Sequence, residues 1–168
     1  MPASRGGPQR FLMIEYCLDT NVCIAIINGS SVPVRARLKA VLAEGSVVCV
    51  SSVVLHELWY GVAKSTQQES NTERVRAFLS GPFEVLPWDD EDARAAGEVR
   101  ALLEKEGQSI GAYDALIAAQ AARRGITLVT ANTREFKRVD GLMWEDWALL
   151  KGSKGSKGSK GSKSSIDD

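Results

Sequence analysis

Short apolar runs alternate with longer amphipathic segments along most of the chain. The apolar runs have the length and the β-branched residues of buried strands, and they cover residues 13–18, 47–50, 83–86, 126–130 and 142–144. The segments between them have helical periodicity and cover residues 20–27, 34–43, 51–64, 69–79, 88–106 and 114–124. Strands that alternate with helices predict an α/β fold, in which a central parallel sheet of about five strands is covered on both faces.

Local signals mark where several of these elements begin and end. Asp19 and Thr20 follow the first apolar run, and both residue types are good N-caps for a helix. Gly29 ends that helix, and Gly125 ends the helix before the fourth strand. The acidic residues at 89–92 favour a helix start because they complement the positive end of the helix dipole.

Both ends of the chain lack the periodicity of the middle. Residues 1–12 contain several Gly and Pro residues, and the Gly-Ser-Lys repeat from 151 to 163 contains no apolar residue. Such segments cannot bury a core, so we expect a disordered extension at 1–12, one folded domain at 13–150 and a disordered tail at 151–168. No apolar stretch has the length of a signal peptide or a membrane span, which predicts a cytoplasmic protein without membrane contact.

The charge balance changes once these ends are set aside. The whole chain has 21 basic and 21 acidic residues, whereas residues 13–150 have 14 basic and 19 acidic ones. An acidic body does not attract nucleic acid through a global field, so RNA contacts would have to come from local basic clusters and bound cations. Cys17, Cys23 and Cys49 lie in apolar contexts that suit buried reduced thiols, and the single histidine, His56, argues against a zinc site.

Four side chains with oxygen ligands lie at matching positions of the predicted sheet. Asp19 follows the first strand, Glu57 lies in the helix after the second, Asp114 opens the helix before the fourth, and Asn132 follows the fourth. Because ligands of open α/β sheets bind beyond the carboxyl ends of the strands, we expect these side chains to meet at one edge. Mg²⁺ or Mn²⁺ would relieve the repulsion between the acids and activate water for phosphodiester hydrolysis.

Each position also has a simpler structural interpretation. Asp19 and Asp114 could serve only as helix caps, Asn132 as a cap or turn residue, and Glu57 as an exposed helix residue. Under that interpretation the chain is a non-catalytic binding module that has no affinity for metal. A phosphatase with an aspartyl nucleophile is a weaker alternative, because Asn21 stands where such enzymes usually have a second Asp.

Four segments, taken in order, resemble the PIN-domain ribonucleases and, within that family, the VapC toxins of bacterial toxin–antitoxin pairs. They are residues 18–24 (LDTNVCI), 51–61 (SSVVLHELWYG), 110–119 (IGAYDALIAA) and 128–136 (LVTANTREF), and the closing segment 141–147 (GLMWEDW) is also similar to the end of such toxins. The likeness covers most of residues 13–150. It implies a PIN-like αβα sandwich and a metal-dependent endoribonuclease that uses Mg²⁺ or Mn²⁺.

The resemblance also assigns roles to individual residues. Matched motif by motif, Asp19, Glu57 and Asp114 are the metal-binding and catalytic acids. Asn132 stands where many PIN domains have a fourth Asp, which implies a weak or substrate-dependent second metal site. Glu135 either supplies the missing negative charge or is an exposed helix residue, and both interpretations stay open.

Further residues of the same segments are expected to support the acids or to hold RNA. Asn21 and Thr130 match positions that orient the acids or their waters in the family, although either could be a cap. The residues expected to contact RNA phosphates follow the fourth strand; they are Arg134, Lys137 and Arg138. Arg123 and Arg124 end the helix that begins near Asp114, and we interpret them as a solvated helix face.

The resemblance finally implies partners and a substrate class. Close toxin relatives cleave tRNA, in some cases initiator tRNA, so we expect tRNA as the substrate. A VapB-like antitoxin would cover the acidic site, and the toxin would form a homodimer. The segments 31–42 and 53–83 offer apolar helical faces for such contacts; the candidate residues are Leu58, Trp59, Tyr60 and Val62, although Trp59 and Tyr60 could equally be ordinary core residues. The alternative within the fold is a PIN-like nuclease that processes other RNA or DNA.

Overall fold

A parallel sheet forms the centre of the computed structural model, which describes residues 13–149 and 154–155 of the 168-residue chain. Within these residues, one sheet carries six strands in the order β3-β2-β1-β4-β5-β6. They are β1 (Ile14–Leu18), β2 (Val47–Ser51), β3 (Phe83–Leu86), β4 (Thr127–Val129), β5 (Trp144–Glu145) and β6 (Lys154–Gly155). The first five are parallel, and β6 pairs antiparallel with β5. The predicted sheet of about five parallel strands is confirmed.

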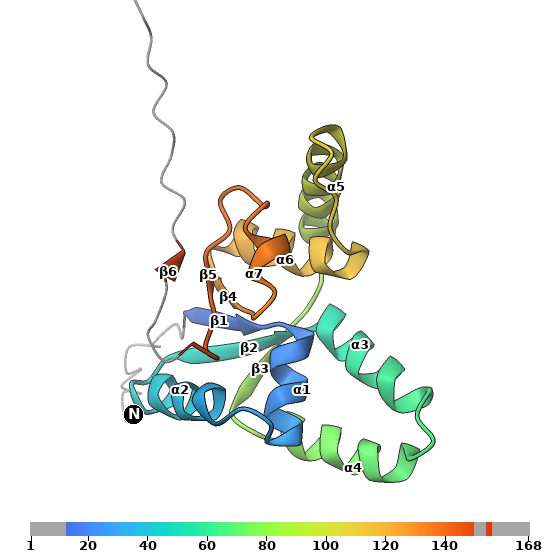
Figure 1. The fold of residues 1–168 in the computed structure, drawn as a ribbon, viewed down its shortest axis with the longest axis vertical. Coiled ribbons are helices and arrows are strands. Elements are labelled where there is room, and N and C mark those ends of the chain that lie inside the picture. Colours follow the sequence, from blue (N-terminus) through green and yellow to red (C-terminus); the bar gives the residue numbers. More distant parts are fainter. Residues whose placement is uncertain (1–12, 150–153, 156–168) are drawn as a thin grey trace, which may run out of the picture.

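Helices connect the parallel strands and cover both faces of the sheet. Those in the described part are α1 (Thr20–Asn28), α2 (Val32–Ala43), α3 (Ser52–Ala63), α4 (Gln68–Leu79), α5 (Asp90–Lys105), α6 (Ala112–Arg124) and α7 (Thr133–Phe136). Figure 1 shows α1, α2 and α4 on one side of the sheet and α5, α6 and α7 on the other. This is the expected αβα sandwich, with α7 as a short helix in addition to the predicted ones.

The order of the strands creates a switch point beside β1. The chain runs from β1 outwards through β2 to β3, and it then returns to the other side of β1 with β4 and β5. Leu18 pairs with Val50 of β2 and with Val129 of β4, so these three strands end at the same level. Ligands of open α/β sheets bind in the crevice at such a point. The residues that follow β1, β2 and β4 are therefore candidates for a functional site.

Two boundaries differ from the predicted ones in a way that concerns this edge. α6 begins at Ala112 with Gly111 in the N-cap position, so Asp114 lies in the first turn. The interpretation of Asp114 as the cap of this helix is therefore wrong. β5 covers Trp144–Glu145, which is later than the predicted 142–144. This shift moves the end of β5 next to Asp146, which the sequence had not singled out.

The start of α5 is fixed by two aspartates. Asp89 Oδ1 accepts a hydrogen bond of 2.8 Å from the Asp92 N–H, and Asp92 Oδ2 accepts one of 3.1 Å from the Asp89 N–H. This reciprocal capping box satisfies two of the free N–H groups at the helix start. α5 therefore begins at Asp90, and the helix start predicted at Trp88 is two residues too early.

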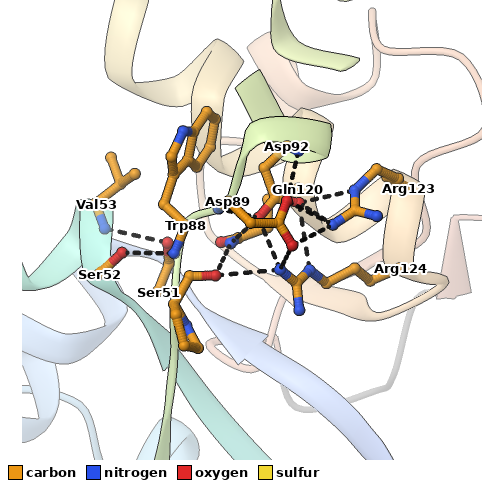
Figure 2. Close-up of polar contacts among 10 residues, drawn as sticks. Ser51, Ser52, Val53, Trp88, Asp89, Asp92, Gln120, Arg123 and Arg124 are labelled. Carbon is orange, nitrogen blue, oxygen red and sulfur yellow. Dashed lines mark hydrogen bonds and ion pairs between the residues drawn. The ribbon is translucent and has the colours of Figure 1, made fainter. Parts of the chain in front are cut away.

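The same aspartates bind the end of α6 to the start of α5 (Figure 2). Arg123 Nη2 lies 2.7 Å from Asp92 Oδ1 and 3.0 Å from Asp89 Oδ1. Arg124 Nη2 lies 2.8 Å from Asp92 Oδ2 and 2.9 Å from Asp89 Oδ2. The interpretation of Arg123 and Arg124 as a solvated helix face is wrong, because each guanidinium bridges both carboxylates. We call these four residues the α5–α6 ion-pair cluster.

Asp92 lies at the buried centre of this cluster. Its side chain has no exposed surface, and Gln120 Nε2 donates a further hydrogen bond of 2.8 Å to Oδ2. Burial alone would raise the pKa of Asp92, but hydrogen bonds from Arg124, Gln120 and Arg123 outweigh it and hold that pKa well below its usual range. Asp92 therefore stays ionised in the folded protein, which keeps its attraction for both arginines.

The core of the domain is made by the strands and by the inner faces of the helices. Leu18, Val50 and Leu128 have no exposed surface and lie on three adjacent strands. The three cysteines are buried and free, as the sequence predicts, and burial raises the pKa of the Cys23 thiol well above its usual value. These thiols are structural, since a buried thiol in apolar surroundings is a poor nucleophile.

The predicted terminal segments fall largely outside the described residues. This holds for 1–12 and for 151–168 apart from Lys154–Gly155, whose backbone forms β6 beside β5. The expectation of disorder at both ends stays a prediction. Among the described residues, none of the helices has both the length and the apolar character that crossing a membrane requires.

Candidate active site

Asp19 lies directly after β1, at the switch point of the sheet. Its side chain is 4% exposed, and Oδ1 accepts a hydrogen bond of 2.7 Å from the N–H of Val22, so Asp19 does cap α1. Burial raises the pKa of Asp19, hydrogen bonds from Thr130 and Val22 lower it, and the charges of Glu57 and Asp146 raise it further. The capping hydrogen bond therefore holds the Asp19 carboxylate within electrostatic reach of Glu57 and Asp146.

Glu57 reaches the same edge from α3, the helix that follows β2. The Thr20 hydroxyl donates a hydrogen bond to Glu57 Oε2, which joins the first turn of α1 to the middle of α3. Glu57 is half-buried and its charge acts on Asp19 and Asp114, so it is not an ordinary exposed helix residue. The contribution of Thr20 was missed at the sequence level, where the Asp-Thr pair was considered only as a helix start.

Asp114 and Glu135 form a second pair of carboxylates at this edge. The pKa of Asp114 is raised to about 6, first by burial and then by the charge of Glu135 and a hydrogen bond between the two side chains. The charges of Glu57 and Asp19 make smaller contributions to the same rise, so three other acids lie within electrostatic reach of Asp114. The Gly111 N–H also donates to Glu135 Oε2 at 3.4 Å. Of the two interpretations of Glu135, the one that puts it with the acids fits these contacts.

The residues after β4 support Asp19. Thr130 is fully buried, and its side chain forms the hydrogen bond to Asp19 described above. Asn132 donates its backbone N–H to Thr130 Oγ1 at 2.9 Å and lies half-buried at the start of α7. Asn21 is exposed in the first turn of α1, and among the described residues its side chain makes no hydrogen bond to the acids.

Asp146 is a further acid of this edge that sequence reasoning missed. It follows β5 directly, and its charge contributes to the raised pKa of Asp19. Its Oδ1 accepts a hydrogen bond of 2.8 Å from the N–H of Ala148, which fixes the turn after the strand. The rule that selected Asp19, an acid just past the end of a strand, would have selected Asp146 if β5 had been placed correctly.

The chemistry of this donor set suits a hard divalent cation. The side chains that gather here offer carboxylate, hydroxyl and amide oxygens, which Mg²⁺ and Mn²⁺ prefer over thiol or imidazole. Among the described residues, no three Asp, Glu, His or Cys side chains are grouped tightly enough to hold a metal ion as they stand. Glu57 is bound to Thr20 and Asp114 to Glu135. A cation would therefore have to draw these carboxylates out of their present contacts.

The predicted RNA-binding residues lie on and after α7, next to the acids. Arg134 and Lys137 are exposed, whereas Arg138 is half-buried and donates a hydrogen bond of 2.9 Å to the carbonyl oxygen of Ser109. Glu135 lies between them in the sequence and contacts Asp114. Two exposed cations thus flank a residue of the acidic edge.

A groove between α1, α3 and α4 extends away from the acids. It has a volume of about 330 Å³, and Glu57 is part of its lining. Its apolar lining consists of Ile24, Ile27, Leu58, Val62 and Val75. Leu58 and Val62 were predicted for such a surface, but Trp59 packs against the core and Tyr60 lies outside the lining. Residues 31–42 were also predicted for this surface, but α1 forms that wall of the groove instead.

Comparisons with known proteins agree on one family. The family described as PIN domain matches residues 16–142. The chain is 43% identical over 136 residues to the tRNA(fMet)-specific endonuclease VapC of Shigella flexneri, an alignment that covers 81% of this chain and 100% of the relative. It is 40% identical over 132 residues to the ribonuclease VapC2 of Rickettsia felis, which covers 79% of this chain and 97% of the relative.

Solved structures show the same likeness. The structure of DNA-bound VapBC from Salmonella typhimurium matches with a TM-score of 0.74 at 40% identity, covering 80% of this chain and 99% of that one. VapBC2 from Rickettsia felis, bound to a promoter DNA fragment, matches with a TM-score of 0.74 at 38% identity and the same coverage. The similarity therefore extends over the whole domain that carries the acids.

Proposed function

Because the chain belongs to the PIN-domain family, and within it to the VapC proteins, we propose that it is a divalent-metal-dependent endoribonuclease and the toxin of a toxin–antitoxin pair. The observation that carries the proposal is the meeting of Asp19, Glu57, Asp114 and Glu135 at one edge of the sheet, where burial and the other three acids raise the pKa of Asp114 to about 6. Acids that disfavour each other's ionisation in this way are typical of sites that hold a cation or transfer a proton.

Asp19, Glu57 and Asp114 would hold Mg²⁺ or Mn²⁺ in this proposal, with Glu135 and the Asn132 amide as weaker ligands. When bound, the cation would supply a water of lowered pKa and offset the charge that develops on the phosphate. A neutral amide in place of a fourth carboxylate leaves less negative charge for a second ion. One tight ion and a weak or substrate-dependent second one are therefore expected.

The protein's own residues position these ligands. The Val22 N–H and Thr130 hold the Asp19 carboxylate in place at the end of β1, so it needs little reorganisation. The Thr20 hydroxyl holds Glu57 at the same edge, through a hydrogen bond that metal binding would have to replace. Asp114 has a pKa near 6 and loses its proton near neutral pH, so it is ionised under the conditions in which RNA is cleaved.

RNA would approach the acids along α7. Arg134 and Lys137 are exposed beside the site, so they are free to contact phosphates on either side of the bond that is cut. Arg138 would contribute after leaving its contact with the Ser109 carbonyl oxygen. Binding through a few local cations fits a domain in which acidic residues outnumber basic ones.

We propose tRNA as the substrate, with initiator tRNA as the first to test. The curated relatives from Shigella flexneri and Salmonella typhimurium are named as tRNA(fMet)-specific endonucleases and are 43% and 41% identical to this chain. Cleavage of tRNA would stop translation, which is the expected action of such a toxin. The protein would then act in the cytoplasm, where its substrate is found.

A VapB-like antitoxin is the proposed partner, and a homodimer the proposed assembly. The groove between α1, α3 and α4 has apolar side chains from all three helices, and its lining also includes Glu57, Asn28, Asn71 and Arg74. An amphipathic antitoxin helix seated there would bury its apolar face and lie over one of the acids. Inhibition would then follow from the blocked access of RNA to Glu57 and its neighbours.

The experiment that tests the proposal uses antitoxin-free protein and total bacterial tRNA. The chain is incubated with Mg²⁺ or Mn²⁺, with EDTA, and as the Asp114→Asn variant, whose folding is checked by its melting temperature. Discrete fragments that depend on metal and on Asp114 are expected, and their ends identify the tRNA and the cut. Intact tRNA in every lane would overturn the tRNA proposal, and survival of all other RNA and of DNA would favour the binding module.

A further inference from the structure

An aromatic pair lies next to the acidic edge and takes no part in the contacts of the acids or the basic residues described above. His56 on α3 and Tyr113 on α6 contact each other, with 3.2 Å between His56 Nε2 and the Tyr113 hydroxyl oxygen. Their ring centroids are 5.4 Å apart and their planes are tilted by 44°. Both side chains are exposed, Tyr113 by 46%. The pair thus presents aromatic surface to solvent across the gap between two helices.

The pair is adjacent in sequence to two of the acids. His56 immediately precedes Glu57, and Tyr113 immediately precedes Asp114. Consecutive helical residues point about 100° apart, so each helix directs its acid and its aromatic ring to different sides. Glu57 contacts Thr20 on α1 and Asp114 contacts Glu135 on α7, while the two rings contact each other. The aromatic pair therefore lies beside the acids and faces a different side of each helix.

Packing of α3 against α6 alone does not account for this pair. A large ring contributes most to helix packing when it is buried, yet nearly half of the Tyr113 surface faces water. Both helices already contribute fully buried residues to the core: Val54 of α3 has no exposed surface and Ile117 of α6 is 1% exposed. The exposed rings are available for a ligand.

We infer that His56 and Tyr113 form a platform on which a nucleobase next to the cut phosphate stacks. The inference rests on the proposed endoribonuclease function and specifies how that site holds its substrate. Proteins that recognise single-stranded RNA loops stack unpaired bases on exposed aromatic rings, and this contact tolerates different bases because each has a π-face. The hydrogen bond to His56 fixes the Tyr113 ring in advance, so little side-chain entropy is lost on binding.

The first test measures RNA affinity without cleavage. An RNA stem-loop that contains the mapped cut is bound to the Asp114→Asn protein with and without the added change Tyr113→Ala. Loss of one stacked base is expected to weaken binding by about 5- to 100-fold. Tyr113→Phe keeps the ring and should stay within about threefold. Leu102→Ala is the matched control, because Leu102 on α5 is also 46% exposed, and it should leave affinity unchanged.

The second test asks whether the ring and a base act on each other. Nucleotides on either side of the cut are replaced one at a time by abasic ones, and KM and kcat are measured for the wild type and for Tyr113→Ala. At one position the abasic RNA should raise the wild-type KM as much as Tyr113→Ala does, and the two changes together should add nothing. The kcat should change less than KM, because the ring touches no reacting atom.

The outcomes separate this inference from the function on which it rests. The platform would be overturned if each abasic substitution raised KM equally in the wild type and in Tyr113→Ala, or if Tyr113→Ala left KM unchanged. Either result would leave RNA cleavage by the wild type, and so the proposed function, intact. Failure of the wild type to cleave any RNA would overturn the proposed function and the inference with it. If Tyr113→Ala melts below the assay temperature, His56→Ala in the same abasic series takes its place and must show the same coupling.

Discussion

Loss of the Asp92 carboxylate is expected to destabilise the fold and to leave the rate of RNA cleavage unchanged. In Asp92→Asn the volume stays nearly constant while the charge that faces Arg123 and Arg124 is removed. Asp92 is fully buried and carries salt bridges of 2.7 and 2.8 Å, so its loss removes the centre of the α5–α6 ion-pair cluster. The cluster lies at the far end of α6, about 14 Å along the helix from Asp114.

The expected loss of stability depends on which contacts Arg123 and Arg124 keep in the variant. Removing one partner of a buried ion pair costs about 3–5 kcal/mol when the other charge is left uncompensated. Arg123 and Arg124 still contact Asp89, which is 45% exposed, and their own side chains are 30% and 24% exposed. The lower end, about 3 kcal/mol, is therefore expected. For a domain of this length that corresponds to a drop in melting temperature of roughly 10 °C.

Urea unfolding and thermal melting in EDTA at pH 7 measure this change, and single-turnover RNA cleavage at 20 °C measures activity. Glu98→Gln is the matched control, because its partner Arg94 forms an exposed pair with side chains 77% and 71% accessible, and it should shift stability by less than about 0.5 kcal/mol. The lowered pKa of Asp92 adds a second check. Its contribution is present above the unfolded pKa near 4 and lost only as the pH falls through the lower folded pKa. If the melting temperature of Asp92→Asn falls by less than about 3 °C at pH 7, the reasoning is refuted.

Three further predictions concern the acidic edge. Cleavage should increase as the pH rises through about 6, where Asp114 loses its proton, and Glu135→Gln should move this increase to lower pH; a profile that is flat between pH 5 and 7 would contradict the assignment. Because the pKa of Asp114 is raised, the metal-free fold should lose stability as the pH rises from about 4 to 6. Mg²⁺ or Mn²⁺ at ten times its Kd should stabilise the fold by about 1.4 kcal/mol at pH 7. The measurement is the shift in melting temperature on adding metal, which the Asp114→Asn variant should lack. Gly111→Ala would place a Cβ 3.1 Å from Asp114 Oδ2 without straining the backbone, so the Asp114 carboxylate would have to shift. Cleavage should then fall by about 10-fold or more, while the melting temperature changes by less than about 2 °C. Wild-type activity of this variant would show that the carboxylate has room to move.

The local pattern of the sequence was sufficient to predict most of the fold. Apolar runs separated by capped amphipathic segments predict the first four strands and the long helices closely, because each element carries its own periodicity and end signals. The rule that sites lie beyond the carboxyl ends of parallel strands then brings Asp19, Glu57 and Asp114 to one edge. The two-residue β5 has too few positions for a periodicity, and its misplaced end hid Asp146.

What the sequence did not reveal are contacts between residues that are far apart in the chain. Asp92 and Arg123 are separated by 31 positions, and nothing in the local sequence of Arg123 distinguishes a buried ion pair from a solvated charge. The Thr20 contact to Glu57 is similar, since a Thr after an Asp at a helix start is fully explained by capping. Both contacts depend on how α1, α3, α5 and α6 pack, which only the assembled fold decides.

The acidic edge also has a consequence for the synthesis of the protein. Its first acid, Asp19, precedes almost all of the domain, whereas Thr130, Glu135 and Asp146 are added near the end of it. The central strand β1 can pair with β4 only after more than a hundred further residues have been made. A nascent chain on the ribosome therefore lacks part of the acidic edge, and if the proposed site is correct, cleavage is expected to begin only when the last strand of the parallel sheet has left the exit tunnel. An antitoxin would need to act only on finished molecules.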